Sequence, residues 1–497
     1  MLSMKYFSVS GLKKVFTHFC ILLVLAIGAS QCFAQSQTNT GSADYKSQKR
    51  YLELINRVFQ YIQYQYVDDV DLEKVYEGAV RGMLDSLGDK HTTYLDKDAW
   101  REITDISQGA FGGVGLSITK AVSGTEEKPA YVEVVKPIEN SPGYNAGIRA
   151  GDKIIAINGQ DTAPLTMNEV LGMLRGEVGT SVTVTVRRGK TDIFERTLVR
   201  AIIENVTVNY DMIGTVGYID ISGFSTETAT HVQEAIDSFK KKNYTGLIID
   251  LRDNGGGLLS SAVDIADKFI DSGTIVSTKS RLRYENSTYR ASASKTTVAK
   301  TIPIVVLVNA NTASASEILT GALKDYHRAY VVGTRTCGKG SVQYPVQLGD
   351  DDGFKLTIAR YYSPSDTNID KIGILPDREV AFADFTPEEI ETYQQLLDDD
   401  TIYRYVDDHE NMTEADIASY AVELKKTYNL DLRVLRKLVR NQVERRHGYS
   451  TYDLDYDVQL NEALKILREE NVFELLKTTK TLKQLEEEEA AKVPVDA

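Results

Sequence analysis

Two short motifs contain the residues best suited to chemistry. Ser314 lies in residues 311–317, which read NTASASE, and Lys339 lies in residues 338–343, which read GKGSVQ. A serine hydroxyl becomes an effective nucleophile when a base accepts its proton, and a neutral lysine amine can be that base. Free lysine has a pKa of about 10.4, but burial in apolar surroundings can lower this pKa by several units. The two motifs therefore indicate a hydroxyl nucleophile whose base is an amine.

The pattern around Ser314 predicts a strand, a tight turn and a helix. Residues 302–308 form an apolar run without charges, and apolar residues at helical spacing follow in 318–323. A helix amino terminus carries unpaired N–H groups, so the N–H of Ala315 could stabilise an oxyanion. Ser314 and Glu317 also fit a helix-capping pattern, which is the structural alternative to catalysis.

A third motif lies at residues 250–257, which read DLRDNGGG and end an apolar strand at 246–249. Glycines allow a backbone N–H to approach a ligand closely, so this loop could supply a second oxyanion donor. An ordinary glycine-rich turn is the alternative. The chemical competitor is a Ser-His-Asp arrangement, because such triads are recognised by geometry and His327 follows Ser314 closely in the chain.

Together, the three motifs resemble those of the C-terminal processing (tail-specific) peptidases, which are serine proteases with a Ser-Lys dyad. The resemblance covers residues from about 45 to 390. It implies that Ser314 is the nucleophile, Lys339 the general base and Gln343 an orienting partner of the lysine. It also implies that the N–H groups of Gly256 and Ala315 form the oxyanion hole, and that neither a metal nor a cofactor is needed.

Three further residues have more than one interpretation, and two others depart from the pattern of the family. Ser316 is a rival nucleophile, although the register of the family favours Ser314. His91 lies in a segment that also resembles the family, and we expect it to pack between domains. Arg175 could couple the binding of a ligand to the active site, or could be a surface arginine. Gly255 and Cys337 depart from the family, in which proline and phenylalanine are common at these positions.

Residues 106–200 resemble a PDZ domain, which binds carboxyl-terminal tails by adding them to a sheet as a strand. Residues 141–148 read SPGYNAGI and residues 150–159 read AGDKIIAING, and these runs match the central signature of the domain. The resemblance implies a carboxylate-binding loop and a first peptide-pairing strand formed by Gly113, Val114, Gly115 and Leu116.

The elements that must position these motifs predict a multidomain α+β protein. Strands expected at 216–221, 246–251, 274–277 and 302–308 alternate with helices at 232–239 and 259–269. The family resemblance implies that this core has a crotonase-like (ββα) fold. The expected regions are a signal peptide at 1–34, a linker at 35–48, an N-terminal helical region at 49–105, the PDZ domain at 106–200, the peptidase core at 201–390 and a helical C-terminal extension at 391–497.

Composition and the leader bear on the compartment and the partners. Residues 1–34 combine lysines with a short apolar stretch, as in an export signal, and no later segment is long and apolar enough to span a membrane. The formal net charge of −14 disfavours nucleic acid as a partner. Cys337 is the one cysteine outside the leader, so an exported chain would contain no internal disulfide.

These observations predict an exported serine endopeptidase of the periplasm or cell envelope. Its PDZ domain would capture protein or peptide substrates by their free C-terminal tails, and the Ser-Lys dyad would hydrolyse them. The C-terminal extension could pack on the core, mediate self-association or bind an adaptor protein. A catalytically inactive PDZ adaptor or scaffold of the cell envelope is the alternative, although the presence of Ser314, Lys339 and Gln343 together disfavours it.

Overall fold

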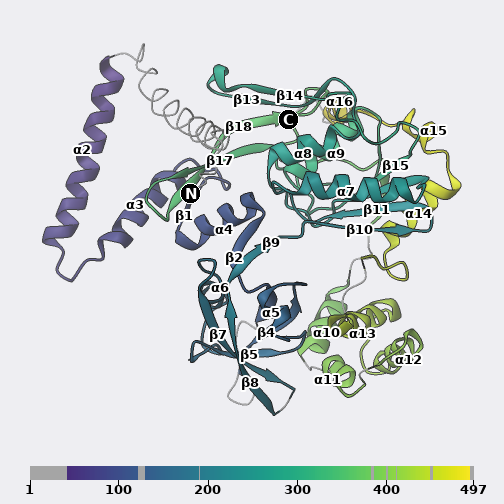
Figure 1. Ribbon diagram of the computed structural model, residues 1–497. Helices are drawn as coiled ribbons and strands as arrows, with labels where there is room; N and C mark the ends of the chain where they lie inside the picture. Colours follow the sequence, from purple (N-terminus) through teal and green to yellow (C-terminus); the bar gives the residue numbers. More distant parts are fainter. Residues whose placement is uncertain are drawn as a thin grey trace, which may run out of the picture. The chain divides into compact units, whose positions relative to one another are not determined.

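The computed structural model describes residues 42–120, 129–189, 191–381, 385–398, 401–409, 411–447 and 451–492 (Figure 1). The chain forms two compact units, Met1–Ser86 and Leu87–Ala497. The expected signal peptide at 1–34 and residues 35–41 of the expected linker lie outside the described residues, whereas residues 42–48 of that linker belong to a helix. None of the helices in the described ranges has both the length and the apolar character needed to cross a membrane.

The first unit contains two helices, α2 (Ser42–Gln65) and α3 (Leu72–Asp85). Asp71 caps α3, because its Oδ1 accepts hydrogen bonds from the backbone N–H groups of Glu73 and Lys74. Several apolar side chains of α2, such as Leu52 and Val58, are exposed within the structure.

The second unit includes a small antiparallel sheet with strand order β3-β4-β5-β7-β8, to which β6 is added beside β5. Val132, Ile154 and Val184 are fully buried in its core. The first strand, β3, lies at the edge of the sheet. The elements are β3 (Leu116–Lys120), β4 (Val132–Pro137), β5 (Lys153–Ile157), β6 (Gln160–Asp161), β7 (Ser181–Arg188), β8 (Asp192–Val199), α5 (Pro142–Asn145) and α6 (Met167–Leu174).

A six-stranded sheet with the order β10-β11-β12-β15-β16-β19 forms the centre of the second unit. Its strands are parallel except for β10, which pairs antiparallel with β11. Every residue of β12 and β15 is buried, as expected for parallel strands that are covered on both faces. The strands are β10 (Val208–Ile213), β11 (Val216–Ile221), β12 (Gly246–Asp250), β15 (Ile304–Val308), β16 (Tyr330–Gly333) and β19 (Arg378–Glu379).

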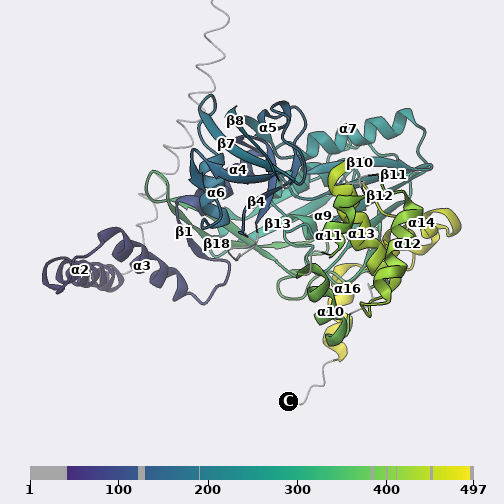
Figure 2. The ribbon, with the colours of Figure 1, turned by 90° about the horizontal axis from the view of Figure 1, so that it is seen from below.

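Helices cover both faces of this central sheet because its side chains alternate. Ile219 and Val306 belong to the core cluster that includes α7 (Thr228–Lys241), α8 (Leu259–Ala266) and α9 (Ala315–Asp325). Tyr218 and Val305, their neighbours along the chain, pack on the other face against α14 (Val458–Glu469) and α15 (Val472–Leu476). Figure 2 shows α7 lying along β10 and β11.

A second sheet of five strands carries the segment after Lys339. The long strand β18 pairs with β1, β13 and β17, and β14 extends the sheet beyond β13. The remaining elements before residue 381 are α4, the short β2–β9 pair and the 3-10 helix η1. Their bounds are β1 (Thr93–Leu95), α4 (Lys97–Gln108), β2 (Ala110–Gly113), β9 (Ala201–Glu204), β13 (Thr274–Ser280), η1 (Arg283–Glu285), β14 (Ser287–Arg290), β17 (Ser341–Gln347) and β18 (Gly353–Tyr362).

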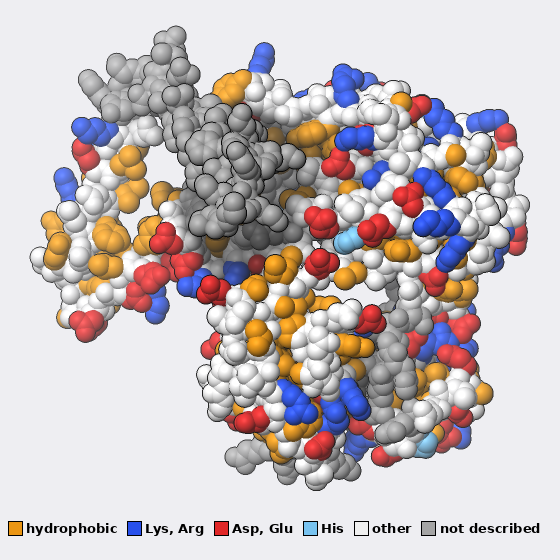
Figure 3. Space-filling model, in the orientation of Figure 1, with side chains coloured by type: hydrophobic (Ala, Val, Ile, Leu, Met, Phe, Trp, Pro, Cys, Tyr) orange, Lys and Arg blue, Asp and Glu red, His pale blue; other side chains and the backbone are white. Residues whose placement is uncertain are grey.

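The C-terminal region contains two structurally different parts. Helices α10 (Pro387–Asp398), α11 (Thr401–Asp408), α12 (Glu414–Lys425) and α13 (Leu432–His447) share a hydrophobic cluster of their own. The later helices α14, α15 and α16 (Leu482–Lys492) instead contribute to the two clusters of the central sheet. On the face drawn in Figure 3, basic and acidic side chains are interspersed over the second unit.

Candidate active site

Ser314 lies in a tight turn between β15 and α9, and its backbone is strained. Its φ of 58° and ψ of −116° fall in a region that residues other than glycine rarely occupy. The turn is held from the glycine-rich loop, because the carbonyl of Asn254 accepts hydrogen bonds from Ala313 N at 3.0 Å and from Ser316 Oγ at 3.0 Å. Such a constrained conformation at the end of a buried strand is typical of a positioned nucleophile.

Glu317 connects the serine turn to the lysine loop. Its side chain is buried and accepts hydrogen bonds from four donors: Ser314 N at 2.9 Å, Lys339 N at 2.9 Å, Gly338 N at 2.8 Å and Thr336 Oγ1 at 2.5 Å. Burial raises the pKa of Glu317, and the four hydrogen bonds oppose this shift. One carboxylate therefore fixes the backbone of both residues of the expected dyad.

Tyr361 makes a second connection between the same two segments. Its buried hydroxyl donates a hydrogen bond to the backbone carbonyl of Lys339 and lies 3.3 Å from the carbonyl oxygen of Ser314. Burial also raises the pKa of Tyr361 well above its usual value, so the hydroxyl remains a donor.

Lys339 and Ser314 line one cavity of about 620 Å³. The side chain of Lys339 is partly buried, and its pKa is lowered first by desolvation and then by the positive charge of Lys355. Cys337 and, to a smaller extent, Glu317 partly oppose this lowering of the pKa. Among the described contacts, no hydrogen bond joins Ser314 Oγ to Lys339 Nζ, so the structure brings the two residues together without a direct bond.

The glycine-rich loop packs directly against Ser314. Gly256 has a φ of 101°, and a Cβ at this position would lie 2.8 Å from the Cβ of Ser314, so a larger residue does not fit. The N–H of Gly256 donates to Asn254 Oδ1 at 2.8 Å rather than remaining unpaired. In the described part of the chain, the N–H groups of Gly257 and Ala315 have no partner, and both residues line the cavity.

The two expected oxyanion donors, Gly256 and Ala315, differ in the pairing of their N–H groups. The N–H of Ala315 is unpaired in the described chain, whereas that of Gly256 is bonded to Asn254 Oδ1 and that of the next residue, Gly257, is unpaired. The pairing of the Gly256 N–H could have been predicted from the sequence, because an asparagine side chain commonly accepts a hydrogen bond from the N–H two residues later. Asn254 makes this turn with Gly256, which leaves the next amide unpaired.

The other expected site residues take different positions. Ser316 is fully buried and its hydroxyl is bonded to the loop, so it does not line the cavity. Gln343 lines the cavity, but its Nε2 donates to Ser341 Oγ at 2.8 Å and to Thr357 Oγ1 at 3.3 Å, not to Lys339. Desolvation lowers the pKa of His91, and the charge of Lys339 lowers it further.

Two further expectations concern residues outside the catalytic cavity. Cys337 is exposed and unpaired with any other cysteine in the described chain. Arg175 forms an ion pair with Asp105 at 2.9 Å, and its guanidinium lies 4.5 Å from the ring centre of Phe111. Arg175 is therefore tied to α4 and β2 rather than free at the surface.

The expected peptide-binding segment lies between β2 and β3. The carbonyl of Val114 accepts a hydrogen bond from Gly143 N at 2.8 Å, and the carbonyl of Gly115 accepts one from Ile138 N at 2.9 Å. Gly115 has a φ of 70°, which glycine adopts without strain. Gly113 ends β2 and Leu116 begins the edge strand β3, where a peptide strand could be added.

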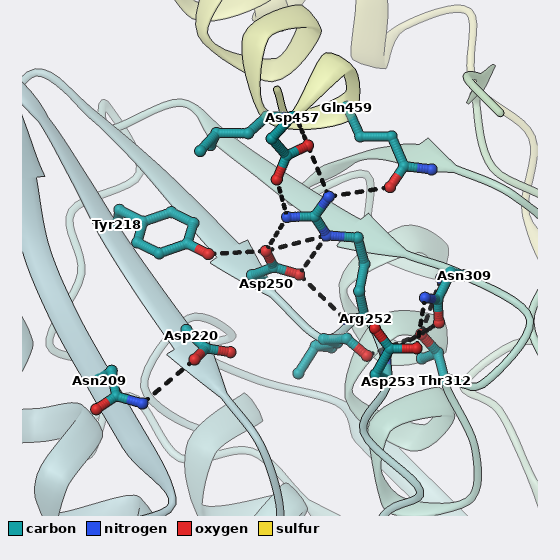
Figure 4. Close-up of polar contacts among 12 residues, drawn as sticks. Asn209, Tyr218, Asp220, Asp250, Arg252, Asp253, Asn309, Thr312, Asp457 and Gln459 are labelled. Atoms are coloured by element: carbon teal, nitrogen blue, oxygen red, sulfur yellow. Dashed lines mark hydrogen bonds and ion pairs between the residues drawn. The ribbon is translucent and has the colours of Figure 1, made fainter. Parts of the chain in front are cut away.

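A charged cluster fixes the base of the glycine-rich loop (Figure 4). Arg252 pairs with Asp250 at the end of β12, and it also bonds Asp457 Oδ1 at 2.8 Å, Asp457 Oδ2 at 2.6 Å and Gln459 Oε1 at 3.0 Å. Tyr218 donates to Asp250 from the neighbouring strand at 2.8 Å. The C-terminal segment thereby supports the loop that faces Ser314. Within the described ranges, no group of three or more His, Cys, Asp or Glu side chains could hold a metal ion.

Family models match three parts of the chain. Residues 215–380 match peptidase family S41, residues 133–188 match the PDZ domain, and residues 21–99 match the activating protease CtpB N-terminal domain. A carboxy-terminal-processing protease of Bartonella bacilliformis is 34% identical over 438 residues, which cover 87% of this chain and 91% of that protein. The carboxy-terminal processing protease CtpA of Bacillus subtilis is 29% identical over 488 residues, which cover 92% of this chain and 100% of that protein. Among solved structures, a photosystem II D1 C-terminal processing protease is 30% identical, with a TM-score of 0.38 over 65% of this chain and 84% of that one.

Proposed function

The chain belongs to peptidase family S41 with the carboxy-terminal processing proteases and carries a PDZ domain, and from this premise we propose that it is an exported endopeptidase that cleaves protein substrates with a Ser-Lys dyad. The observation that carries the proposal is the sharing of one buried carboxylate by the serine and lysine backbones. Glu317 holds the strained turn of Ser314 and the loop of Lys339 in one rigid arrangement beside a cavity.

In the proposed reaction, neutral Lys339 accepts the proton of Ser314 Oγ while that oxygen attacks a peptide carbonyl. The negative charge on the carbonyl oxygen is stabilised by the N–H groups of Ala315 and Gly257. The tetrahedral intermediate then breaks the C–N bond, and Lys339 returns its proton to the leaving amine. Water next attacks the acyl-enzyme while Lys339 accepts a proton from it. The second tetrahedral intermediate then breaks its C–Oγ bond, Lys339 returns the proton to Ser314 Oγ, and the new carboxyl-terminal product leaves.

The lowered pKa of Lys339 supports this assignment. An amine with an ordinary pKa would be protonated near neutral pH and could not accept the serine proton. Desolvation and the nearby charge of Lys355 both favour the neutral form. The fully buried hydroxyl of Ser316 is a poor candidate for the nucleophile, because its oxygen is already engaged by the loop.

We further propose that the PDZ domain selects substrates by their free carboxyl-terminal tails. The edge position of β3 suits the addition of a peptide strand, and the loop at 113–116 lies beside it. The proposed compartment is the periplasm or cell envelope, on the basis of the export-like leader at residues 1–34. We also propose that the C-terminal region binds an adaptor protein or mediates self-association.

The test is cleavage of an unfolded peptide that ends in apolar residues with a free carboxylate. We expect the wild type to cleave this peptide, and we expect Ser314→Ala and Lys339→Ala each to reduce kcat by at least about 1,000-fold. Circular dichroism should show that both variants remain folded. The comparison variant is Ser316→Ala, which loses one bond that holds the Ser314 turn but keeps the bond from Ala313 N, so it should retain far more activity than Ser314→Ala.

Two outcomes would contradict the proposal. Tight binding of the tail by the wild type without any cleavage would favour the inactive PDZ adaptor. Cleavage that survives Lys339→Ala but disappears in Ser316→Ala would reassign the nucleophile and its base. Fractionation of cells that express the full chain tests the proposed export, since recovery in the cytoplasm alone would contradict it.

A further inference from the structure

The catalytic cavity contains a second lysine that takes no part in the proposed proton transfers, although its charge acts on Lys339. Lys355 lies on β18 and lines the same cavity as Lys339. Its side chain has neither an ion pair nor a hydrogen bond among the described residues. The lining of the cavity includes no Asp or Glu, so it presents two amines and no compensating carboxylate.

The strand register relates Lys355 to the strand that follows the Lys339 loop. β17 begins at Ser341, directly after the Lys339 loop, and runs beside β18 (Figure 1). Pro345 pairs with Lys355 and also lines the cavity, as does Gln343, which pairs with Thr357. With a rise of about 3.3 Å per residue, Lys355 lies on the order of 13 Å along the strand from Ser341.

One carboxylate that bonds to β18, that of Asp89, is already engaged by other donors. Asp89 accepts hydrogen bonds from Thr357 Oγ1 at 2.5 Å, from Thr92 Oγ1 at 2.8 Å and from His91 N at 3.0 Å. It forms no ion pair with Lys355 in the described contacts. The ammonium of Lys355 is therefore available to an anion that enters the cavity.

We propose that Lys355 binds a carboxylate of the substrate inside the catalytic cavity, roughly two to four residues from the cleaved bond. The proposal rests on the proposed function, because it assumes that a peptide occupies this cavity. The carboxylate is either an Asp or Glu side chain or the terminal carboxylate of a short tail. Lys355 thus determines specificity, while Lys339 performs the proton transfer.

The test compares amidated peptides that carry a single Glu at successive positions around the cleaved bond with the same peptides carrying Gln. At one position, we expect wild-type kcat/KM to be about 10- to 100-fold higher for Glu than for Gln. Lys355→Met should reduce this ratio to within about 3-fold, and Lys355→Arg should retain most of it. Lys241→Met, a change at an exposed lysine of α7, is the matched control and should leave the ratio unchanged.

A second arm distinguishes the two sources of the carboxylate. Peptides that end two to four residues after the cleaved bond are compared as free acids and as amides in wild type and Lys355→Met. The free-acid-to-amide preference of the wild type is divided by that of Lys355→Met, and this quotient removes any contribution of the PDZ domain to carboxylate binding. A preference for the free acid that Lys355→Met abolishes assigns the terminal carboxylate, whereas a preference limited to the internal Glu assigns the side chain.

Binding to the Ser314→Ala variant separates this proposal from the proposed function. If the wild type cleaves nothing, the affinities of Ser314→Ala and of Ser314→Ala with Lys355→Met for the Glu and Gln peptides still test the role of Lys355. Equal Glu-to-Gln ratios with and without Lys355 at every position, in both cleavage and binding, would overturn it. Each enzyme is assayed on the plateau of its own pH profile, because removal of Lys355 also changes the charge near Lys339.

Discussion

Replacement of Glu317 by glutamine should separate the folding of the protein from its chemistry. The carboxylate accepts two donors on each oxygen: Thr336 Oγ1 and Gly338 N on Oε1, and Ser314 N and Lys339 N on Oε2. An amide has one acceptor oxygen, so its NH₂ group must face at least one backbone N–H, whichever way it is turned. The hydroxyl of Thr336 can rotate to accept, but a backbone N–H cannot.

The expected magnitude follows from the bonds that are lost. One or two charge-assisted hydrogen bonds, each contributing about 1.5–3 kcal/mol, disappear. The loss is partly offset because the variant no longer buries a charge. We therefore expect Glu317→Gln to lower the free energy of unfolding by about 2–4 kcal/mol, as measured by urea denaturation.

The catalytic effect should exceed what this loss of stability explains. At a temperature where Glu317→Gln is folded, kcat should fall by about 100-fold, because the Ser314 turn and the Lys339 loop lose their shared acceptor. KM should change by less than about 3-fold. The control is Thr336→Val, which removes one donor to the carboxylate and leaves its three backbone bonds, so it should lose stability but little kcat. A folded Glu317→Gln enzyme with wild-type kcat would refute the positioning role of this carboxylate.

Three further predictions concern charged groups. With neutral Lys339 as the proposed base, its lowered pKa predicts that kcat/KM rises with pH through an apparent pKa below the ordinary lysine value. A pH profile that rises only near or above about 10.4 would contradict this. Burial and then the charge of Asp250 raise the pKa of Asp220 from 3.8 to about 6. Between these two pH values the folded state keeps the proton of Asp220 while the unfolded chain has lost it. The free energy of unfolding therefore falls as pH rises from 3.8 to about 6. Asp220→Asn should remove this slope and raise the free energy of unfolding at pH 7 by about 2 kcal/mol, and an unchanged pH dependence of denaturation would disprove it. Asp457→Ala should cost about 2–4 kcal/mol in urea denaturation because it removes the partner of Arg252 and the cap of α14, and Asp457→Asn, which keeps a capping oxygen, should cost clearly less.

The elements of the central sheet could be predicted from sequence because their signals are local. The strand expected at 216–221 coincides with β11, and those expected at 246–251 and 302–308 overlap β12 and β15. Continuous apolar runs identify buried parallel strands without knowledge of their partners. The fold class, with a PDZ domain and an S41 peptidase core, is confirmed by the family matches.

The connections between the elements could not be predicted, because they depend on distant residues. Glu317 is recognisable as a helix-capping residue, but nothing local to it indicates that the lysine loop donates to the same carboxylate. Asp457 contacts Arg252 across 205 positions of the chain, so the motif at 250–257 gives no sign of its C-terminal partner. The C-terminal region divides into a separate cluster and a part of the core, and this division could not be predicted for the same reason. Both parts consist of helices, and nothing local to a helix indicates which cluster it joins.

The arrangement of charges around Lys339 resolves an apparent conflict in the site. A buried carboxylate close to a catalytic amine should favour the ammonium and so inactivate the base, and Glu317 does act on Lys339 in this direction. Its oxygens, however, are fully used by backbone N–H groups and one hydroxyl, so it makes no ion pair with the amine among the described contacts. Desolvation and the charge of Lys355 act in the opposite direction and prevail, because the pKa of Lys339 is lowered overall. The site can therefore use a negative charge to position its backbone while the pKa of the amine stays lowered, and Lys355 contributes to that lowering from the same cavity.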